Sequence, residues 1–321
     1  MIMAAYLVRR FAVSVLVLFL VTIGLFGLVH AAPGDPVTMM VPVEQLGADS
    51  ADFIEQKRHE LGLDRPLPAQ YWSWLQGVAT GDLGYSLTNN RPVSELLAER
   101  LGPTIELMGL GLALGIAIAI PLGMLAAVRR NTAVDYWTAA LSLGAVSIPG
   151  FFLCILAIYV FALQLGWVPS AGMSTPGAPS LGDSLHHLVM PVAILTFGVA
   201  GPFTRYVRSG VIAELGSEYV KTAESKGATP RRILFGHVLR NALIPLITIL
   251  GLTLPALLVG AVVVEQIFAW PGMGQLVISA VNQQDYPVII GFAFFVAILV
   301  LLSNMLADVL YSIADPRVSL Q

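Results

Sequence analysis

Ser217–Gly227, with the sequence SEYVKTAESKG, lies at the centre of a polar interval, Ile212–Arg240, that interrupts an otherwise apolar C-terminal half. The stretch has the length of a short helix, and the glycine at its end is typical of a helix C-terminus. Thr229 and Pro230 follow, a pair that favours the N-cap and the first turn of a second helix. The sequence therefore predicts two short helices joined at Gly227, held beside a membrane and suited to contact another protein.

The composition of the chain places most of it in a lipid bilayer. Of its 321 residues, 56% are hydrophobic and 12% are charged, and the mean hydropathy is +0.79. Charged residues make up about 25% of an average soluble protein. The single cysteine, Cys154, lies in an apolar run, so no intrachain disulfide can form. We expect an all-α integral membrane protein.

Apolar runs of about 20 residues, the length that crosses the hydrocarbon core as a helix, give the number of spans. The six predicted spans are Phe11–Val29, Glu106–Val128, Tyr136–Leu163, Leu188–Tyr206, Ala242–Val264 and Pro287–Leu310. Several contain prolines that predict interruptions, either kinks around a cavity or simple bends that improve packing: Pro121, Pro149, Pro245 and Pro255.

The distribution of lysine and arginine predicts the orientation. Two arginines precede the first span, two follow the second, and seven basic residues lie within Arg205–Arg240. The loops Gly166–His187 and Glu265–Tyr286 contain none. An even number of spans returns both termini to one side, and the positive-inside rule makes that side, with the polar interval, cytoplasmic.

The first span also resembles a secretory signal peptide, because Arg9 and Arg10 precede an apolar core that ends near Val29-His30-Ala31. That core exceeds the roughly 7–15 residues typical of a signal peptide. We therefore predict an uncleaved anchor. Cleavage, the alternative, would leave five spans and an external N-terminus.

These predictions divide the chain into a first transmembrane helix, an extracytoplasmic segment, and a five-helix core that includes the polar loop 212–240: residues 1–31, 32–102 and 103–321. In the extracytoplasmic segment, Asp52–Leu61 and Ala69–Val78 are predicted helices, the second with an apolar side of Tyr71, Trp72 and Trp74. This segment forms either a cap on the membrane domain or a landing surface for an external partner.

Sequence patterns for catalysis, metals and nucleotides are absent. No Gly-x-x-x-x-Gly-Lys-Ser/Thr loop occurs, so any coupling to ATP needs another subunit. Adjacent His186 and His187 point about 100° apart on a helix, which favours interfacial polar residues over a chelating pair. The sequence contains neither a Ser-His-Asp order nor a Gly-x-Ser-x-Gly elbow, so it gives no support to a membrane hydrolase. We predict no enzyme activity, metal or cofactor in this chain, and no nucleic-acid partner.

Charged residues inside the spans would mark an ion or proton route, and the sequence places few there. Glu106, Glu265 and Asp308 all lie near predicted span ends. This disfavours the main alternative, a passive channel or secondary carrier, and leaves open a structural or assembly subunit. By position alone, Pro149, Pro255 and Glu265 are candidates for a translocation path.

The polar interval also carries a family resemblance. Lys221-Thr222-Ala223, followed by three residues and then Gly227, resembles the EAA segment of bacterial ABC-importer permeases, although Lys221 stands where that family often has an acidic residue. Arg240–Pro245, with the sequence RNALIP, is similar to the ending used in the dipeptide/oligopeptide/nickel branch. Other segments agree in order along nearly the whole chain: Pro33–Pro36, Leu63–Pro66, Gly81–Ser86, Glu265–Phe268, Pro271–Gly274, Asp285–Val288 and Asp315–Arg317. Together they resemble the first permease subunit of such a system.

The resemblance implies a type I ABC importer permease fold of six transmembrane helices with a small extracytoplasmic insertion after the first. It implies a bacterial plasma (inner) membrane location, a homologous second permease subunit, two cytoplasmic ATPase subunits or domains that hold ATP and Mg, an extracytoplasmic solute-binding protein, and surrounding lipid. Peptides, nickel chelates, haem-like molecules, glutathione and some sugars are all compatible substrates.

The resemblance further implies that the polar interval is a coupling loop inserted into a cleft on one ATPase. ATP binding and hydrolysis would move the loop and open the cavity to each side in turn. A solvated loop lying on anionic lipid is the alternative. Small side chains permit close approach, basic ones can pair with acidic rims, and an aromatic one fits a pocket. The residues concerned are Glu218, Tyr219, Lys221, Thr222, Ala223, Lys226, Gly227, Arg231 and Arg232.

Overall fold

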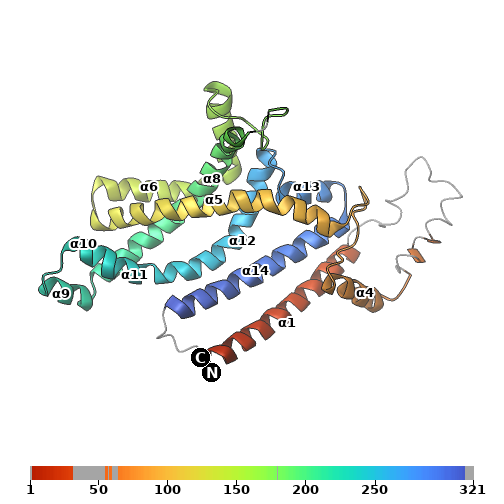
Figure 1. Cartoon of the computed structure of the whole chain (residues 1–321), viewed down its shortest axis with the longest axis horizontal. Helices are drawn as coiled ribbons and strands as arrows, with labels where there is room; N and C mark the ends of the chain where they lie inside the picture. The colour runs from red at the N-terminus through yellow and green to blue at the C-terminus, as the bar shows by residue number, and fades with distance from the viewer. Residues whose placement is uncertain (1, 32–54, 57, 60–63, 179, 315–321) are drawn as a thin grey trace. The chain divides into compact units, whose positions relative to one another are not determined.

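A computed structural model describes residues 2–31, 55–56, 58–59, 64–178 and 180–314, and these residues are mostly helical (Figure 1). In chain order the helices are α1 (Ile2–Ala31), α4 (Leu67–Ala79), α5 (Val93–Val128), α6 (Ala133–Ser147), α7 (Gly150–Ala157), α8 (Leu181–Leu215), α9 (Glu218–Ser225), α10 (Pro230–Ile233), α11 (Leu239–Ala242), α12 (Ile244–Ile267), α13 (Met273–Asn282) and α14 (Tyr286–Ala314). Two π-helical segments, η2 (Ile158–Gln164) and η3 (Leu234–Val238), continue α7 and α10.

The long apolar helices agree with the predicted membrane spans. Among the described residues, α1, α5, α8, α12 and α14 contain five stretches long and apolar enough to cross a membrane. The count rises to six if α6 and α7–η2 form one broken span. The structure therefore supports the predicted all-α membrane protein.

The third predicted span, Tyr136–Leu163, departs from the expected kink at Pro149. Its two halves, α6 and α7–η2, meet at an angle of 102°. Ile148, the residue before the proline, is extended at φ −87° and ψ 122°, and Pro149 becomes the N-cap of α7. A proline disfavours the helical conformation of the residue before it, so α6 ends at Ser147.

The other predicted proline interruptions have different outcomes. Pro121 and Pro255 lie inside the continuous helices α5 and α12. Pro245 lies in the first turn of α12, directly after the break at Leu243 that separates α11 from α12. A backbone N–H there has no partner within the helix, so proline removes nothing.

By its contacts the chain divides into two units, Met1–Gly102 with Leu276–Leu301, and Pro103–Gln275 with Leu302–Gln321. The sequence-based division at residues 31 and 102 stays a prediction. Of the segments singled out in the sequence, Pro33–Pro36 and Asp315–Arg317 lie outside the described residues, as does most of the helix expected over Asp52–Leu61.

In the first unit, α4 packs against α1 through aromatic side chains. The hydroxyls of Thr22 and Tyr71 lie 2.8 Å apart, and the Phe26 ring lies 5.4 Å from that of Tyr71 and 6.1 Å from that of Trp74. The helix expected over Ala69–Val78 is confirmed as α4. Trp72 does not share its apolar side, because it is 57% exposed and follows Tyr71 by about 100° around the helix.

The first unit also joins two of the segments noted in the sequence. Asp285 is buried and accepts hydrogen bonds from the hydroxyls of Ser86 and Thr88 and from the Leu87 backbone N–H. A buried carboxylate needs such donors to offset its lost hydration. The segments Gly81–Ser86 and Asp285–Val288 are therefore joined by the hydrogen bonds to the buried Asp285 carboxylate.

In the second unit, α8 packs against α6 and α12 (Figure 1). It also meets α5 at small residues. A Cβ atom added at Gly111, Gly115 or Gly123 would come within 2.7 Å of the side chain of Leu195, Val199 or Val207, respectively. Small residues let two helix backbones approach closely, which is the usual way membrane helices pack.

Candidate functional site

The polar interval forms the helical hairpin that the sequence predicts. We call Ser217–Ile233, which contains α9 and α10, the α9–α10 hairpin. Gly227 ends α9 with a φ of +77°, and no neighbour would obstruct a Cβ atom at this position. Glycine is favoured here by the left-handed backbone, not by a lack of space. Thr229 caps α10 by accepting a hydrogen bond of 3.4 Å from the Arg232 N–H.

Apolar side chains hold the hairpin on the rest of its unit. Val220 and Ile233 are 2% and 4% exposed, and Val238 in η3 is fully buried. The segment that follows returns to α8, where a Cβ atom on Gly210 would lie 3.0 Å from the Ala242 carbonyl oxygen. Burial of these residues makes the hairpin a fixed projection at the end of α8 (Figure 1).

Tyr219 faces back toward its own chain. It is half-buried, and its hydroxyl donates a 2.6 Å hydrogen bond to Oε2 of Glu214. Burial, and then the bond to the Glu214 carboxylate, raise the pKa of the Tyr219 phenol, so it stays neutral. The expected role of Tyr219 as an anchor in a partner's pocket stays a prediction.

The charged side chains of the hairpin face outward, as expected from the sequence. Lys221 pairs with Glu218 at 2.7 Å, with both side chains more than half exposed. Within the described residues, none of Lys226, Arg231 and Arg232 is paired with a carboxylate, and all three are exposed. The structure thus gathers the exposed basic side chains of Lys226, Arg231 and Arg232 on one projection.

The two small residues of the predicted site also lie on this projection. Thr222 is exposed, and its hydroxyl donates to the Glu218 carbonyl oxygen at 2.9 Å. Ala223 is half-buried, and its carbonyl oxygen accepts from the Ala228 N–H at 3.1 Å, which closes the turn. All nine residues assigned to this loop from the sequence therefore belong to one hairpin.

The residues proposed for a translocation path lie at the break between α6 and α7 and on α12. Pro149 is exposed at the α6–α7 break, and Pro255 is half-buried inside α12. A cavity of about 670 Å³ between α7, η2 and α8 contains neither of them, and its lining is almost wholly apolar. A path through these three residues stays a prediction.

Glu265, the third of them, is fully buried at the end of α12. Its Oε2 accepts a 2.6 Å hydrogen bond from the Gly274 N–H. A Cβ atom on Gly272 would lie 2.2 Å from its carboxylate carbon. Pro271–Gly274 therefore folds closely over Glu265, and a side chain at position 272 would displace the carboxylate from its hydrogen bonds.

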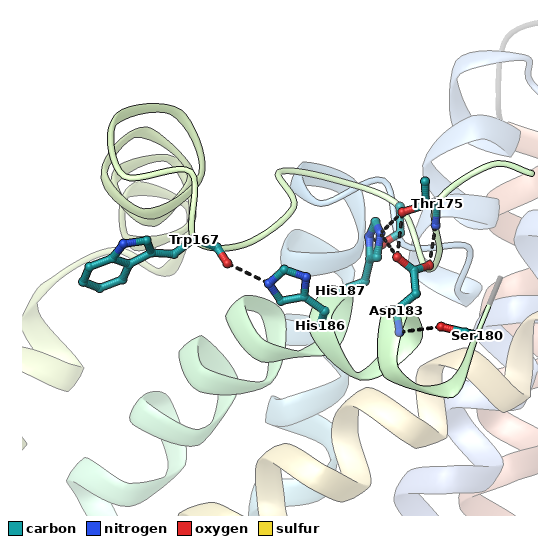
Figure 2. Close-up of polar contacts among 7 residues, drawn as sticks. Trp167, Thr175, Ser180, Asp183, His186 and His187 are labelled. Atoms are coloured by element: carbon teal, nitrogen blue, oxygen red, sulfur yellow. Dashed lines mark hydrogen bonds and ion pairs between the residues drawn. The ribbon is translucent and has the colours of Figure 1, made fainter. Parts of the chain in front are cut away.

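Figure 2 shows a polar cluster at the start of α8, in which His186 and His187 lie near Asp183 and Thr175, two residues that the sequence did not single out. His186 donates from Nε2 to the Trp167 carbonyl oxygen at 2.6 Å, and His187 donates from Nδ1 to the Gly172 carbonyl oxygen at 3.1 Å. Asp183 accepts two bonds of 2.6 Å, from the backbone N–H and the hydroxyl of Thr175. The two histidines hold different points of one loop, which agrees with their predicted divergence on a helix.

The sequence analysis also did not predict the ion pair between Asp135 on α6 and Arg208 on α8, whose charged groups lie 2.5 Å apart. In the sequence, Arg208 is only one of the seven basic residues of Arg205–Arg240 that predict the orientation. An acidic residue in the first turn of a helix is a common N-terminal signal and does not identify a distant partner.

The family model described as "Binding-protein-dependent transport system inner membrane component" matches residues 119–320. A second model, "Binding-prot-dependent transport system membrane comp, N-term", matches residues 3–108. Together the two matches take in most of the chain.

Individual relatives and a solved structure agree with these matches. Oligopeptide transport system permease protein AppB of Bacillus subtilis is 41% identical over 318 residues, which cover 98% of this chain and 99% of AppB. Glutathione transport system permease protein GsiC of Escherichia coli O6:H1 is 35% identical over 316 residues, with 98% and 99% covered. A chain of the inward-facing MetNI methionine ABC transporter has the same fold, with a TM-score of 0.57 and 23% identity over 68% of this chain and 96% of that one. This chain therefore belongs to the inner membrane components of binding-protein-dependent transport systems, and it is a permease subunit of an ATP-driven importer.

Proposed function

We propose that the chain forms half of the translocation path of a peptide importer and is driven by a separate ATPase docked on the α9–α10 hairpin. AppB is named for oligopeptide transport and GsiC for glutathione, itself a small peptide. The other subunits would be a homologous second permease, two cytoplasmic ATPase chains or domains that hold ATP and Mg, and an extracytoplasmic solute-binding protein. The chain itself would have no catalytic site.

The observation that carries this proposal is the contrast between the two sides of the hairpin. Val220 and Ile233 are buried, so the hairpin moves with α8, while Lys226, Arg231 and Arg232 face outward without partners among the described residues. A rigid, charged projection transmits force only if another body grips it. Electrostatic complementarity with an acidic cleft would give such a contact its specificity.

Contact with anionic lipid explains the hairpin less well. Its exposed face also carries Glu218 and Glu224, which anionic headgroups would repel. Its apolar residues, Val220 and Ile233, point into the protein instead of toward a bilayer. An amphipathic membrane-surface helix shows the reverse arrangement, with its apolar face free.

A copurification experiment tests the docking assignment. The tagged complex is purified from membranes as the parent, as the charge-reversed variant Arg231→Glu with Arg232→Glu, and as the control Arg129→Glu, whose side chain is exposed outside the hairpin. We expect the parent and the control to retain the ATPase and the second permease. The double variant should retain the permease and lose ATPase affinity about tenfold, equal to about 1.4 kcal/mol. Equal ATPase retention by all three would refute docking at the hairpin.

Uptake by the reconstituted complex tests the substrate class and the source of energy. A peptide mixture should compete with labelled peptide uptake, whereas a nickel chelate and haem should not. Uptake should require ATP and the solute-binding protein. Transport by the purified chain alone would instead indicate a passive channel or carrier.

A further inference from the structure

One turn of α8 joins three other elements of its unit. Val207 lies against α5, where a Cβ atom on Gly123 would be 2.6 Å from its own Cβ. Arg208 is paired with Asp135 on α6, and Gly210 lies against Ala242 of α11. This turn is therefore the place where the segment that leaves the hairpin, the α8 helix and α6 are in contact.

The contact with α6 is a two-pronged ion pair. Arg208 donates from Nε to Oδ1 of Asp135 at 2.5 Å and from Nη2 to Oδ2 at 2.8 Å. The Asn131 N–H donates to the same Oδ2 at 2.9 Å. The Asp135 side chain is 6% exposed and that of Arg208 is 28% exposed. A guanidinium fork on a carboxylate fixes the angle between the two groups as well as their distance.

Stability alone is a weak reason for this pair. Removing two charges from water is costly, and apolar residues of similar volume often stabilise such a site equally well. The fork instead prevents α6 from sliding or rotating on α8. Another contact between α6 and α8 is that of Gly201 with Ala145, and a contact between two such small residues does not fix the angle between groups as a fork does.

The far end of α6 leads to the break at Ile148–Pro149. With 15 residues, α6 is about 22 Å long. The chain then turns by 102° into α7, which contacts both α8 and α12. If α6 moves with α8 as a rigid body, the displacement is therefore passed on to α7, whose axis points in a different direction.

We propose that the Asp135–Arg208 pair transmits motion from the α9–α10 hairpin to α6 and, through the Pro149 break, to α7. The two residues are positioning residues, since they act through the helices they join. This inference rests on the proposed function, in which an ATPase grips the hairpin. Without the pair, α8 would move while α6 lagged behind, so ATP hydrolysis would continue with less transport.

The test measures transported solute per ATP hydrolysed in the reconstituted complete transporter. The variants are Asp135→Asn, Arg208→Lys and the neutral double variant Asp135→Asn with Arg208→Met. The double variant leaves no unpaired buried charge, so it should fold even if a single variant does not. The control is Arg91→Gln, which removes an exposed ion pair with Glu95 and Glu99.

We expect the double variant and Asp135→Asn to lower the transport-to-ATP ratio about tenfold, within the usual range of coupling effects. ATP hydrolysis and ATPase copurification should stay within about twofold of the parent. Arg208→Lys, which keeps the charge and loses the fork, should give an intermediate ratio, and Arg91→Gln should not change it. An unchanged ratio in the well-folded double variant would overturn the proposal, as would a parallel loss of hydrolysis and transport. Failure of the parent to copurify an ATPase would instead refute the proposed function.

Discussion

Thr104 and Glu265 are separated by 161 positions in the chain, and the Thr104 hydroxyl donates a 2.6 Å hydrogen bond to Oε1 of Glu265. Both side chains are buried, at 2% and 0% exposure. The same Thr104 oxygen accepts a 2.8 Å bond from the Met273 N–H. One hydroxyl therefore joins α5, the end of α12 and the start of α13, and the stability of this junction depends on it.

Replacing Thr104 with valine should destabilise the protein. The change keeps the shape of the side chain and leaves both the Glu265 oxygen and the Met273 N–H without this partner. An unsatisfied buried polar group costs about 1–3 kcal/mol. Thermal unfolding in detergent should show a lower midpoint for Thr104→Val and a near-normal one for Thr104→Ser, which keeps the hydroxyl. Equal midpoints for the two variants would contradict the assignment.

Gly272→Ala should be more damaging than an alanine elsewhere in the same region. Its methyl group would lie 2.2 Å from the Glu265 carboxylate, which the hydrogen bonds from Thr104 and Gly274 hold in place. The matched control is Gly260→Ala, where no atom lies within 4 Å of the added carbon. We expect a loss of about 1–3 kcal/mol for the first change, by overpacking, and little for the second. Folded yield and the unfolding midpoint measure both, and similar values for the two would show that the turn adjusts freely.

The variants Gly227→Asp and Gly227→Asn together distinguish the effect of an added charge from the effect of backbone strain. Both tolerate a positive φ better than other side chains do, so their conformational cost should be nearly the same. Gly227→Asp adds a negative charge between the exposed cations of the hairpin. We expect it to leave the complex assembled while lowering uptake per ATP about tenfold, with Gly227→Asn close to the parent. Full transport by Gly227→Asp would argue strongly against docking at this surface.

The histidines of Figure 2 should control different parts of one loop. His187→Leu removes the donor to the Gly172 carbonyl and the contact with Thr175. Loss of about 1 kcal/mol of hydrogen bonding should speed amide exchange around Thr175 about fivefold. His186→Leu releases the Trp167 carbonyl and should act on the residues near Trp167 alone. Hydrogen exchange measured by mass spectrometry distinguishes the two, and the same pattern in both variants would contradict this division.

Cysteine labelling tests the proposed orientation. The native Cys154 is buried, so it should react slowly with a membrane-impermeant maleimide. Ser225→Cys places an exposed thiol in the hairpin and Ala178→Cys places one in the loop before α8. In intact cells with a permeable outer envelope, only Ala178→Cys should be labelled, and lysis should expose Ser225→Cys. Labelling of Ser225→Cys before lysis would place the hairpin outside the cell.

Much of the architecture follows from local features of the chain. The glycine stop at Gly227 and the cap at Thr229 depend on neighbouring residues, so the α9–α10 hairpin is predictable from a few positions. The break at Pro149 is signalled in the same way, but its angle is not. Proline sets the conformation of Ile148, whereas the direction of α7 depends on its packing against α8 and α12.

Polar contacts between distant residues were not predictable from the sequence. Glu265 lies at a span end, as expected, yet nothing local indicates that Thr104 and Gly274 satisfy it. Arg208 is one of several arginines on the same predicted side, and only the packing of α6 on α8 brings it to Asp135. Tyr219 reads as an interface aromatic, whereas the structure turns its hydroxyl toward Glu214.

Sequence by itself determined membrane residence, the helical character of the chain and the charged hairpin with its glycine turn. Hydropathy, backbone hydrogen bonding within a helix and capping act over a few residues. Their effects can therefore be predicted from residues that are neighbours in the sequence. Only the tertiary structure decided which charged side chains form pairs, such as Asp135 with Arg208. It also decided which carboxylates are buried, such as that of Glu265. Those outcomes depend on how closely whole helices approach one another, and that depends on small residues such as Gly123 and on the side chains packed around them.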